Sequence, residues 1–173
     1  MIYFDSSDML KCYLPEHGHD EVTQVWEQAE TVVCCELGKS EFVAAVHRHL
    51  REGRITDDGL QAVLQAWRED QAADLWDWFP LNEEVFTEVE ELFSKLPSSI
   101  FLRSADAIHL TCVRMLGLTE INSVSRFRQS VFHSNLAAEL DRRSIGRVSK
   151  LRMHVQSSGR VRPRIASASA GTL

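Results

Sequence analysis

The chain has 173 residues, of which 44% are hydrophobic and 25% are charged, with a net charge of −6 at pH 7. This composition is ordinary for a soluble globular domain with a hydrophobic core, and no apolar run approaches the roughly 20 residues that cross a bilayer, so a membrane protein is not expected. The chain does not open on a basic stretch followed by an apolar one, so we expect no secretory signal and a cytoplasmic protein.

The first part of the chain alternates short β-prone segments with segments of helical spacing. The pattern predicts strands over 2–4 and 31–34, and helices over 6–14, 21–29 and 37–50. Pro15 and Gly53 are stop signals for the first and third of these helices. Asp5 or Ser6 can cap the first helix.

The second part continues the alternation. Further helices are predicted over 57–75, 83–96, 104–116 and 125–140, and further strands over 78–81 and 120–124. Asn82 is a capping residue, and Gly117 closes the helix that precedes it. Short strands that alternate with helices predict an α/β fold, with a short, mostly parallel central sheet covered by helices on both faces in three layers, α/β/α.

Charge divides the chain into two regions. Eight basic residues and no acidic residue follow Asp141, whereas the first 141 residues hold 11 basic and 25 acidic ones. We therefore predict one domain over 1–140 and a basic tail over 141–173. The tail is expected to be disordered or partly ordered, and its charge leaves nucleic-acid binding as an alternative role.

The four cysteines do not follow a metal-binding or redox pattern. Cys12, Cys34, Cys35 and Cys112 form no C-x-x-C pair, which zinc ribbons and thioredoxin-like sites require. Cys34 and Cys35 belong to an apolar strand, where small thiols pack well. We predict reduced, buried cysteines.

Three carboxylates from distant parts of the chain each lie at the edge of an apolar segment. They are Asp5 after the first strand, Glu41 on the third predicted helix and Asp106 near the start of the helix over 104–116. A carboxylate beside buried structure is unfavourable unless a positive charge neutralises it, and ligands of parallel sheets gather beyond the carboxyl ends of the strands. The pattern suggests a shared cation and phosphate chemistry. Each acid also has a local alternative: Asp5 as a helix cap, Glu41 as an exposed helix residue, and Asp106 as a first-turn acid that stabilises the helix dipole.

Three segments resemble motifs of PIN-domain proteins of the VapC toxin type. Residues 2–16 read IYFDSSDMLKCYLPE, residues 36–46 read ELGKSEFVAAV and residues 103–110 read RSADAIHL. The resemblance covers residues 1 to about 140 and implies a metal-dependent endoribonuclease that cleaves RNA, with an antitoxin protein as partner and a homodimer as a further option. It implies that Asp5, Glu41 and Asp106 are catalytic and hold Mg²⁺ or Mn²⁺, and that Ser7 orients a ligand by hydrogen bonding.

The sequence departs from the family pattern at a fourth acidic position. Alignment on the following segment places Val124 there, or Ser125 after a shift by one, with Asn122 at a nearby polar position that can bind water or phosphate. One-metal catalysis, weak activity and a degenerate, non-catalytic PIN domain that binds RNA or protein all remain open.

Several residues close in sequence to the three acids have two possible roles. Lys11 and Arg103 can contact substrate phosphates or stay solvated at the surface. We expect Asp8 to be a solvent-facing helix residue. His109 lies three residues after Asp106, and we expect it to be packed or hydrogen-bonded rather than a metal ligand.

Overall fold

The computed structural model describes residues 1–118. The strands within this range are β1 (Ile2–Tyr3), β2 (Val32–Cys35) and β3 (Asp77–Phe79). The helices are α1 (Ser6–Lys11), α2 (His19–Gln28), α3 (Leu37–Arg51), α4 (Asp57–Ala72), α5 (Glu83–Lys95) and α6 (Ser104–Met115). The strand predicted over 120–124, the helix predicted over 125–140 and the tail over 141–173 lie outside the described residues. Every helix within 1–118 is too short or too polar to cross a lipid bilayer.

The three strands form one parallel sheet in the order β1-β2-β3. Tyr3 is paired with Val33, and Cys35 is paired with Phe79, so β2 is the central strand. Parallel neighbours require crossover connections, which α1 and α2 supply between β1 and β2, and α3 and α4 supply between β2 and β3. The predicted α/β fold with a short parallel sheet is confirmed for these residues.

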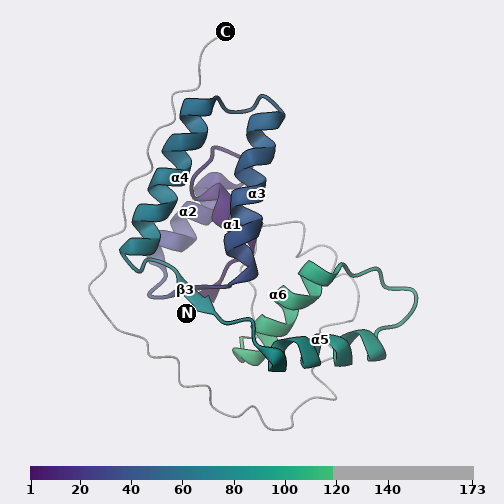
Figure 1. Ribbon diagram of the computed structural model, residues 1–173. Coiled ribbons are helices and arrows are strands. Elements are labelled where there is room, and N and C mark those ends of the chain that lie inside the picture. The colour runs from purple at the N-terminus through teal and green to yellow at the C-terminus, as the bar shows by residue number, and fades with distance from the viewer. Residues whose placement is uncertain (119–173) are drawn as a thin grey trace.

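Helices cover both faces of this sheet. Val32 and Cys34 of β2 belong to one hydrophobic cluster, with side chains of α1 to α4, whereas Val33 and Cys35 point to the other face and belong to a second cluster, with side chains of α5 and α6. This alternation is the period of two expected of a strand. Figure 1 shows the result, with α1 to α4 on one side and α5 and α6 on the other. The predicted three-layer arrangement is confirmed.

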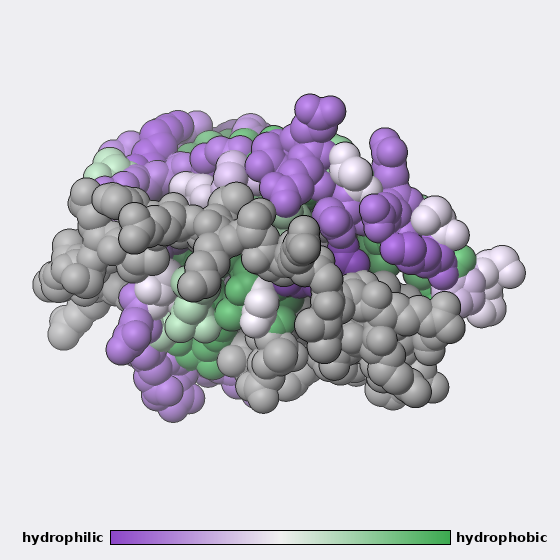
Figure 2. All heavy atoms as spheres, turned by 90° about the horizontal axis from the view of Figure 1, so that it is seen from below, coloured by the Kyte–Doolittle hydropathy of each residue, from purple (hydrophilic) through white to green (hydrophobic). Residues whose placement is uncertain are grey.

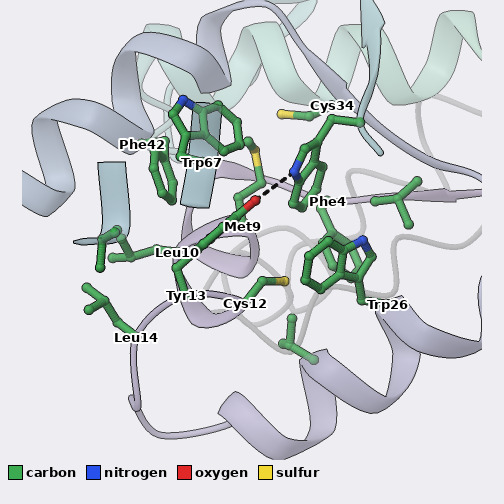
Figure 3. Packing of buried hydrophobic residues seen from close by; sticks show 14 of the residues in the cluster. Phe4, Met9, Leu10, Cys12, Tyr13, Leu14, Trp26, Cys34, Phe42 and Trp67 are labelled. Atoms are coloured by element: carbon green, nitrogen blue, oxygen red, sulfur yellow. Dashed lines mark hydrogen bonds between the residues drawn. The ribbon is translucent and has the colours of Figure 1, made fainter. Parts of the chain in front are cut away.

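An aromatic cluster built around Tyr13 fills the larger of the two cores (Figure 3). The Phe42 and Trp67 rings stack with centroids 4.3 Å apart, and Tyr13 meets both edge-on. The Tyr13 hydroxyl donates to Asp70 Oδ2 at 2.5 Å and accepts from Trp76 Nε1 at 2.9 Å. The phenol therefore satisfies two buried polar groups in an otherwise apolar core.

Several predicted element boundaries are wrong by a few residues. Helix α4 ends at Ala72 rather than 75, because Asp74 adopts a left-handed conformation (φ 52°) and the Leu75 N–H turns back to bond the Asp70 carbonyl. Strand β3 ends at Phe79 rather than 81, because Pro80 has no N–H to extend the ladder. Helix α1 ends at Lys11 rather than 14, since the chain tightens there into turns that bond the Met9 and Leu10 carbonyls.

Candidate active site

Asp5 lies between β1 and α1, and its carboxylate caps that helix. Oδ1 of Asp5 accepts hydrogen bonds from the backbone N–H groups of Ser7 and Asp8, both at 2.9 Å, and from Ser7 Oγ at 2.7 Å. The residue is buried, so three donors compensate for the removal of this oxygen from water. The capping alternative for Asp5 is confirmed, and it fixes the carboxylate at the carboxyl end of β1.

Glu41 is brought to the same end of the sheet by α3, which begins two residues after β2. Its Oε2 lies 2.8 Å from His109 Nε2, and its side chain is 28% exposed. The alternative of an ordinary exposed helix residue is therefore wrong for Glu41. Helix α3 can lie close to β2 because Gly38 has no side chain, and a Cβ there would overlap Cys34 Sγ.

Asp106 lies in the first turn of α6 and is partly buried. Burial raises its pKa, and the negative charges of Glu41 and Asp5 raise it further, whereas His109 and Arg103 lower it. Two carboxylates that shift the pKa of a third must lie within electrostatic reach of it. The fold therefore gathers three acids that are far apart in sequence into one neighbourhood.

The other predicted site residues have different surroundings. Ser7 is exposed and bonds Asp5, as described above. Arg103 is exposed at the N-cap position of α6, and its charge acts on Asp106. Asn122, Val124 and Ser125 lie beyond the part of the chain that the structure describes.

Asp8 and Lys11 are buried, so the prediction of a solvent-facing Asp8 and the surface alternative for Lys11 are wrong. Asp8 is 0% exposed and Lys11 is 8% exposed, and Lys11 Nζ lies 3.2 Å from Asp8 Oδ1. The pKa of Asp8 is raised to about 7, because burial and the charge of Asp5 raise it more than Lys11 lowers it. Lys11 thus contacts Asp8 inside the protein, and Asp8 lies one helical turn after Asp5, which caps α1.

A hydrogen-bonded chain through His109 connects the sheet to Glu41. His109 is 3% exposed, and its Nδ1 lies 2.7 Å from the Tyr3 hydroxyl while its Nε2 meets Glu41. Burial lowers the pKa of His109, but hydrogen bonds to Cys35 and Glu41 outweigh it and raise the pKa to about 10. The prediction that His109 is hydrogen-bonded is confirmed. Its partners, separated from it by 68 and 106 positions, follow no local pattern that the sequence could reveal.

Sulfur donors lie on the sheet side of the same histidine. Cys34, Cys35 and His109 each offer a ligand atom, and these atoms lie within 4.8 Å of one another. All four cysteines are free and buried, as predicted, but the approach of two of them to a histidine was not foreseen. Thiolates and imidazole suit soft or borderline ions such as Zn²⁺. Hydrogen bonds to Tyr3 and Glu41 already occupy both nitrogens of His109.

The carboxylates provide a different kind of donor set. Carboxylate oxygens are the ligands that Mg²⁺ and Mn²⁺ prefer, and Asp5, Glu41 and Asp106 can supply one or more each. Their mutual influence fits a divalent cation, because the like charges that raise the pKa of Asp106 would be neutralised by it. The chemistry of these residues therefore suits a hard divalent ion.

Comparison with known proteins identifies the family of this chain. A search among curated proteins found no match. The family model of the PIN domain matches residues 2–129, which is most of the chain and includes all three acids. PIN domains are generally nucleases that act on RNA and typically bind divalent metal ions. The extent of the match, together with the parallel sheet, shows that the chain belongs to the PIN-domain family.

Proposed function

We propose that this protein is a metal-dependent endoribonuclease in which Asp5, Glu41 and Asp106 hold Mg²⁺ or Mn²⁺. The observation that carries the proposal is the contact of His109 with both Glu41 and Tyr3, because His109 lies three residues after Asp106 and Tyr3 lies two residues before Asp5. The charges of Glu41 and Asp5 also act on Asp106. Three acids that share a neighbourhood at the carboxyl end of a parallel sheet form the kind of site that divalent ions occupy. When bound, such an ion activates water and stabilises the charge that develops on phosphorus.

The residues around the acids would keep them in place and attract the substrate. The backbone donors at the start of α1 hold Asp5, and His109 holds Glu41. Arg103 is exposed beside Asp106, where its guanidinium can contact an RNA phosphate. We do not assign such a contact to Lys11, because its ammonium is buried against Asp8.

Cleavage of a single-stranded RNA panel by the full chain tests this proposal. We expect cleavage with Mg²⁺ or Mn²⁺, loss of cleavage in EDTA, and losses of at least about 100-fold for Asp5→Asn, Glu41→Gln and Asp106→Asn. Asp58→Asn is the matched control, because Asp58 also lies in the first turn of a helix but is exposed on α4. Undiminished cleavage by the Asp5 and Asp106 variants, or cleavage in EDTA, would contradict the mechanism.

A non-catalytic PIN domain that binds RNA or protein is the second candidate, and the missing fourth acid favours it. The sequence has Val124 where the resemblance leads us to expect a carboxylate, so a second cation would be held weakly. RNA binding without cleavage, at any concentration of Mn²⁺, would support this candidate. If the position faces the ions, Val124→Asp should raise Mn²⁺ affinity or activity.

The toxin role and the protein partners rest on the resemblance to VapC-type toxins. On that basis we propose an antitoxin as partner and a homodimer as a further assembly. Phe86 and Phe93, two turns apart on α5, and Phe101 before α6 are exposed, which suits a protein contact. Figure 2, seen from the side of α5 and α6, shows hydrophobic residues at the surface beside hydrophilic ones. Arrest of cell growth by the wild-type chain, but not by Asp106→Asn, would support the toxin role.

A further inference from the structure

We infer that His109 is a positioning residue of the acidic site, which holds the Glu41 carboxylate in its place, and that Tyr3 in turn holds His109. This inference rests on the proposed function, since it concerns the same site. It begins from the Nε2–Oε2 distance of 2.8 Å between His109 and Glu41. A carboxylate only accepts hydrogen bonds, so Nε2 is the donor in either protonation state of the ring.

Glu41 needs such a partner because of where it lies. Its side chain is 28% exposed and has several rotatable bonds, so it loses conformational entropy when it is held in one orientation. A donor on a buried, rigid ring restricts it before any ion arrives. Ligands held in this way by an outer layer of hydrogen bonds bind metal more tightly than unrestrained ones.

The ring of His109 is itself held on its opposite edge. Tyr3 Oη lies 2.7 Å from His109 Nδ1, and the backbone N–H of Cys35 donates to Tyr3 Oη at 3.3 Å. The two rings also meet edge to face, with centroids 5.9 Å apart. Tyr3 belongs to β1 and Cys35 to β2, so the chain of hydrogen bonds runs from the rigid sheet through two buried rings to the carboxylate.

The same arrangement links two of the acids. His109 lies three residues after Asp106 on α6, so the two side chains share a face of that helix. His109 bonds Glu41 of α3, and one helix therefore supplies one acid and fixes the position of another. The separation between Glu41 and Asp106 is set by this turn of α6 rather than by the rotamer of Glu41 alone.

A pair of variants separates positioning from packing. The amide nitrogen of Gln reaches roughly as far as Nε2 of histidine, and that of Asn roughly as far as Nδ1. His109→Gln can therefore keep the bond to Glu41, whereas His109→Asn loses it. We expect calorimetric titration of the full chain with Mn²⁺ to give about 10-fold weaker binding for His109→Asn, and affinity close to wild type for His109→Gln.

His49 provides the matched control. It is also buried, and its Nε2 lies 3.1 Å from Glu16 Oε1, away from the acids of the proposed site. His49→Asn should leave the Mn²⁺ affinity unchanged although it too breaks a histidine–glutamate pair. In a Glu41→Ala background, which removes the acceptor of the bond from His109, His109→Asn should cause no further loss, because its effect acts through Glu41.

The outcomes distinguish this inference from the proposed function. If wild type does not bind Mn²⁺, the proposed function fails. If wild type binds Mn²⁺ and folded His109→Asn binds it equally well, or if His109→Gln is as weak as His109→Asn, positioning by His109 is wrong. Should the His109 variants not fold, Tyr3→Phe decides, since it removes one hydroxyl and keeps the ring: weaker Mn²⁺ binding at an unchanged melting temperature supports the inference, and unchanged binding overturns it.

Discussion

Gly38 of α3 lies so close to Cys34 of β2 that a methyl group on the glycine would overlap the cysteine sulfur. Met9 Sδ would lie 3.2 Å from the same methyl group. We predict that Gly38→Ala lowers the free energy of unfolding by about 1–3 kcal/mol, because either the buried Cys34 side chain or α3 must shift to make room. Urea unfolding measures this loss. Since Glu41 is one turn further along α3, Mn²⁺ binding should weaken as well.

Gly59→Ala is the control for this change. Gly59 lies in α4, and the nearest atoms to an added Cβ are 3.5 Å away, which is an ordinary contact. Alanine there should raise the free energy of unfolding by up to about 1 kcal/mol, because it stiffens the unfolded chain and favours the helix. A Gly38→Ala protein as stable as wild type would show that the close approach carries no strain.

Asp8 should make stability depend on pH. Because burial raises its pKa to about 7 in the folded protein, the folded state retains a proton that the unfolded chain releases near pH 4. The contribution of Asp8 to the free energy of unfolding is therefore fully present below about pH 4 and is lost, by on the order of 4 kcal/mol, as the pH rises to about 7. Asp8→Asn should flatten this part of the stability curve, measured by urea unfolding across that range.

The exposed Asp57, at the start of α4, serves as the comparison for Asp8. Its asparagine variant should retain the pH dependence of wild type. An Asp8→Asn protein whose stability changes with pH as steeply as wild type would mean that the buried carboxyl is not the group responsible.

Arg103 should set the pH at which the acids bind metal. Its positive charge lowers the pKa of Asp106, against the effects of burial and of the other acids. Arg103→Gln should therefore raise the pKa of Asp106, so that protons compete with Mn²⁺ up to a higher pH. Calorimetric titrations across the acidic range should show the loss of affinity shifted upward, whereas Arg54→Gln, exposed after α3, should leave it in place. An unchanged pH dependence in Arg103→Gln would show that the charge of Arg103 does not act on these acids.

Tyr13 should stabilise the larger core through its hydroxyl. Tyr13→Phe leaves Asp70 Oδ2 and Trp76 Nε1 without this partner, and we predict a loss of about 1–3 kcal/mol in the free energy of unfolding. The effects of Tyr13→Phe and Asp70→Asn should not be additive, because both act on one hydrogen bond. Additive losses in a double-mutant cycle would show that the hydrogen bond between Tyr13 and Asp70 carries no coupling energy.

The sequence predicts the elements well where the signals are local. Apolar periodicity identifies α3 to α6, and Asn82 caps α5 with a side-chain bond to the Val85 N–H, as expected. The order of strands and helices predicts the parallel sheet. The predicted ends of the elements are less accurate. Helices α4 and α1 end where the left-handed Asp74 and the turns after Lys11 make hydrogen bonds that only the folded structure shows.

The sequence indicates the three acids as candidate site residues but not the residues that surround them. The positions of Asp5, Glu41 and Asp106 follow from their place at the edges of apolar segments. The burial of Asp8 does not, since a polar residue on a short helix is buried only when the neighbouring helices close over it. The contacts of His109 with Tyr3 and Glu41 join residues of three separate elements, and only the folded chain shows them.

Asp5 caps α1 and is also one of the three proposed metal ligands, so a substitution there affects both helix stability and the proposed site. Alanine at this position would remove the capping oxygen along with the charge, at a cost of about 1 kcal/mol, so a loss of activity there would mix two effects. Asparagine caps a helix as well as aspartate does, and it differs from aspartate chiefly in charge. If the proposed function holds, Asp5→Asn would therefore give an inactive protein that keeps its architecture, which is the form needed to trap an uncut RNA.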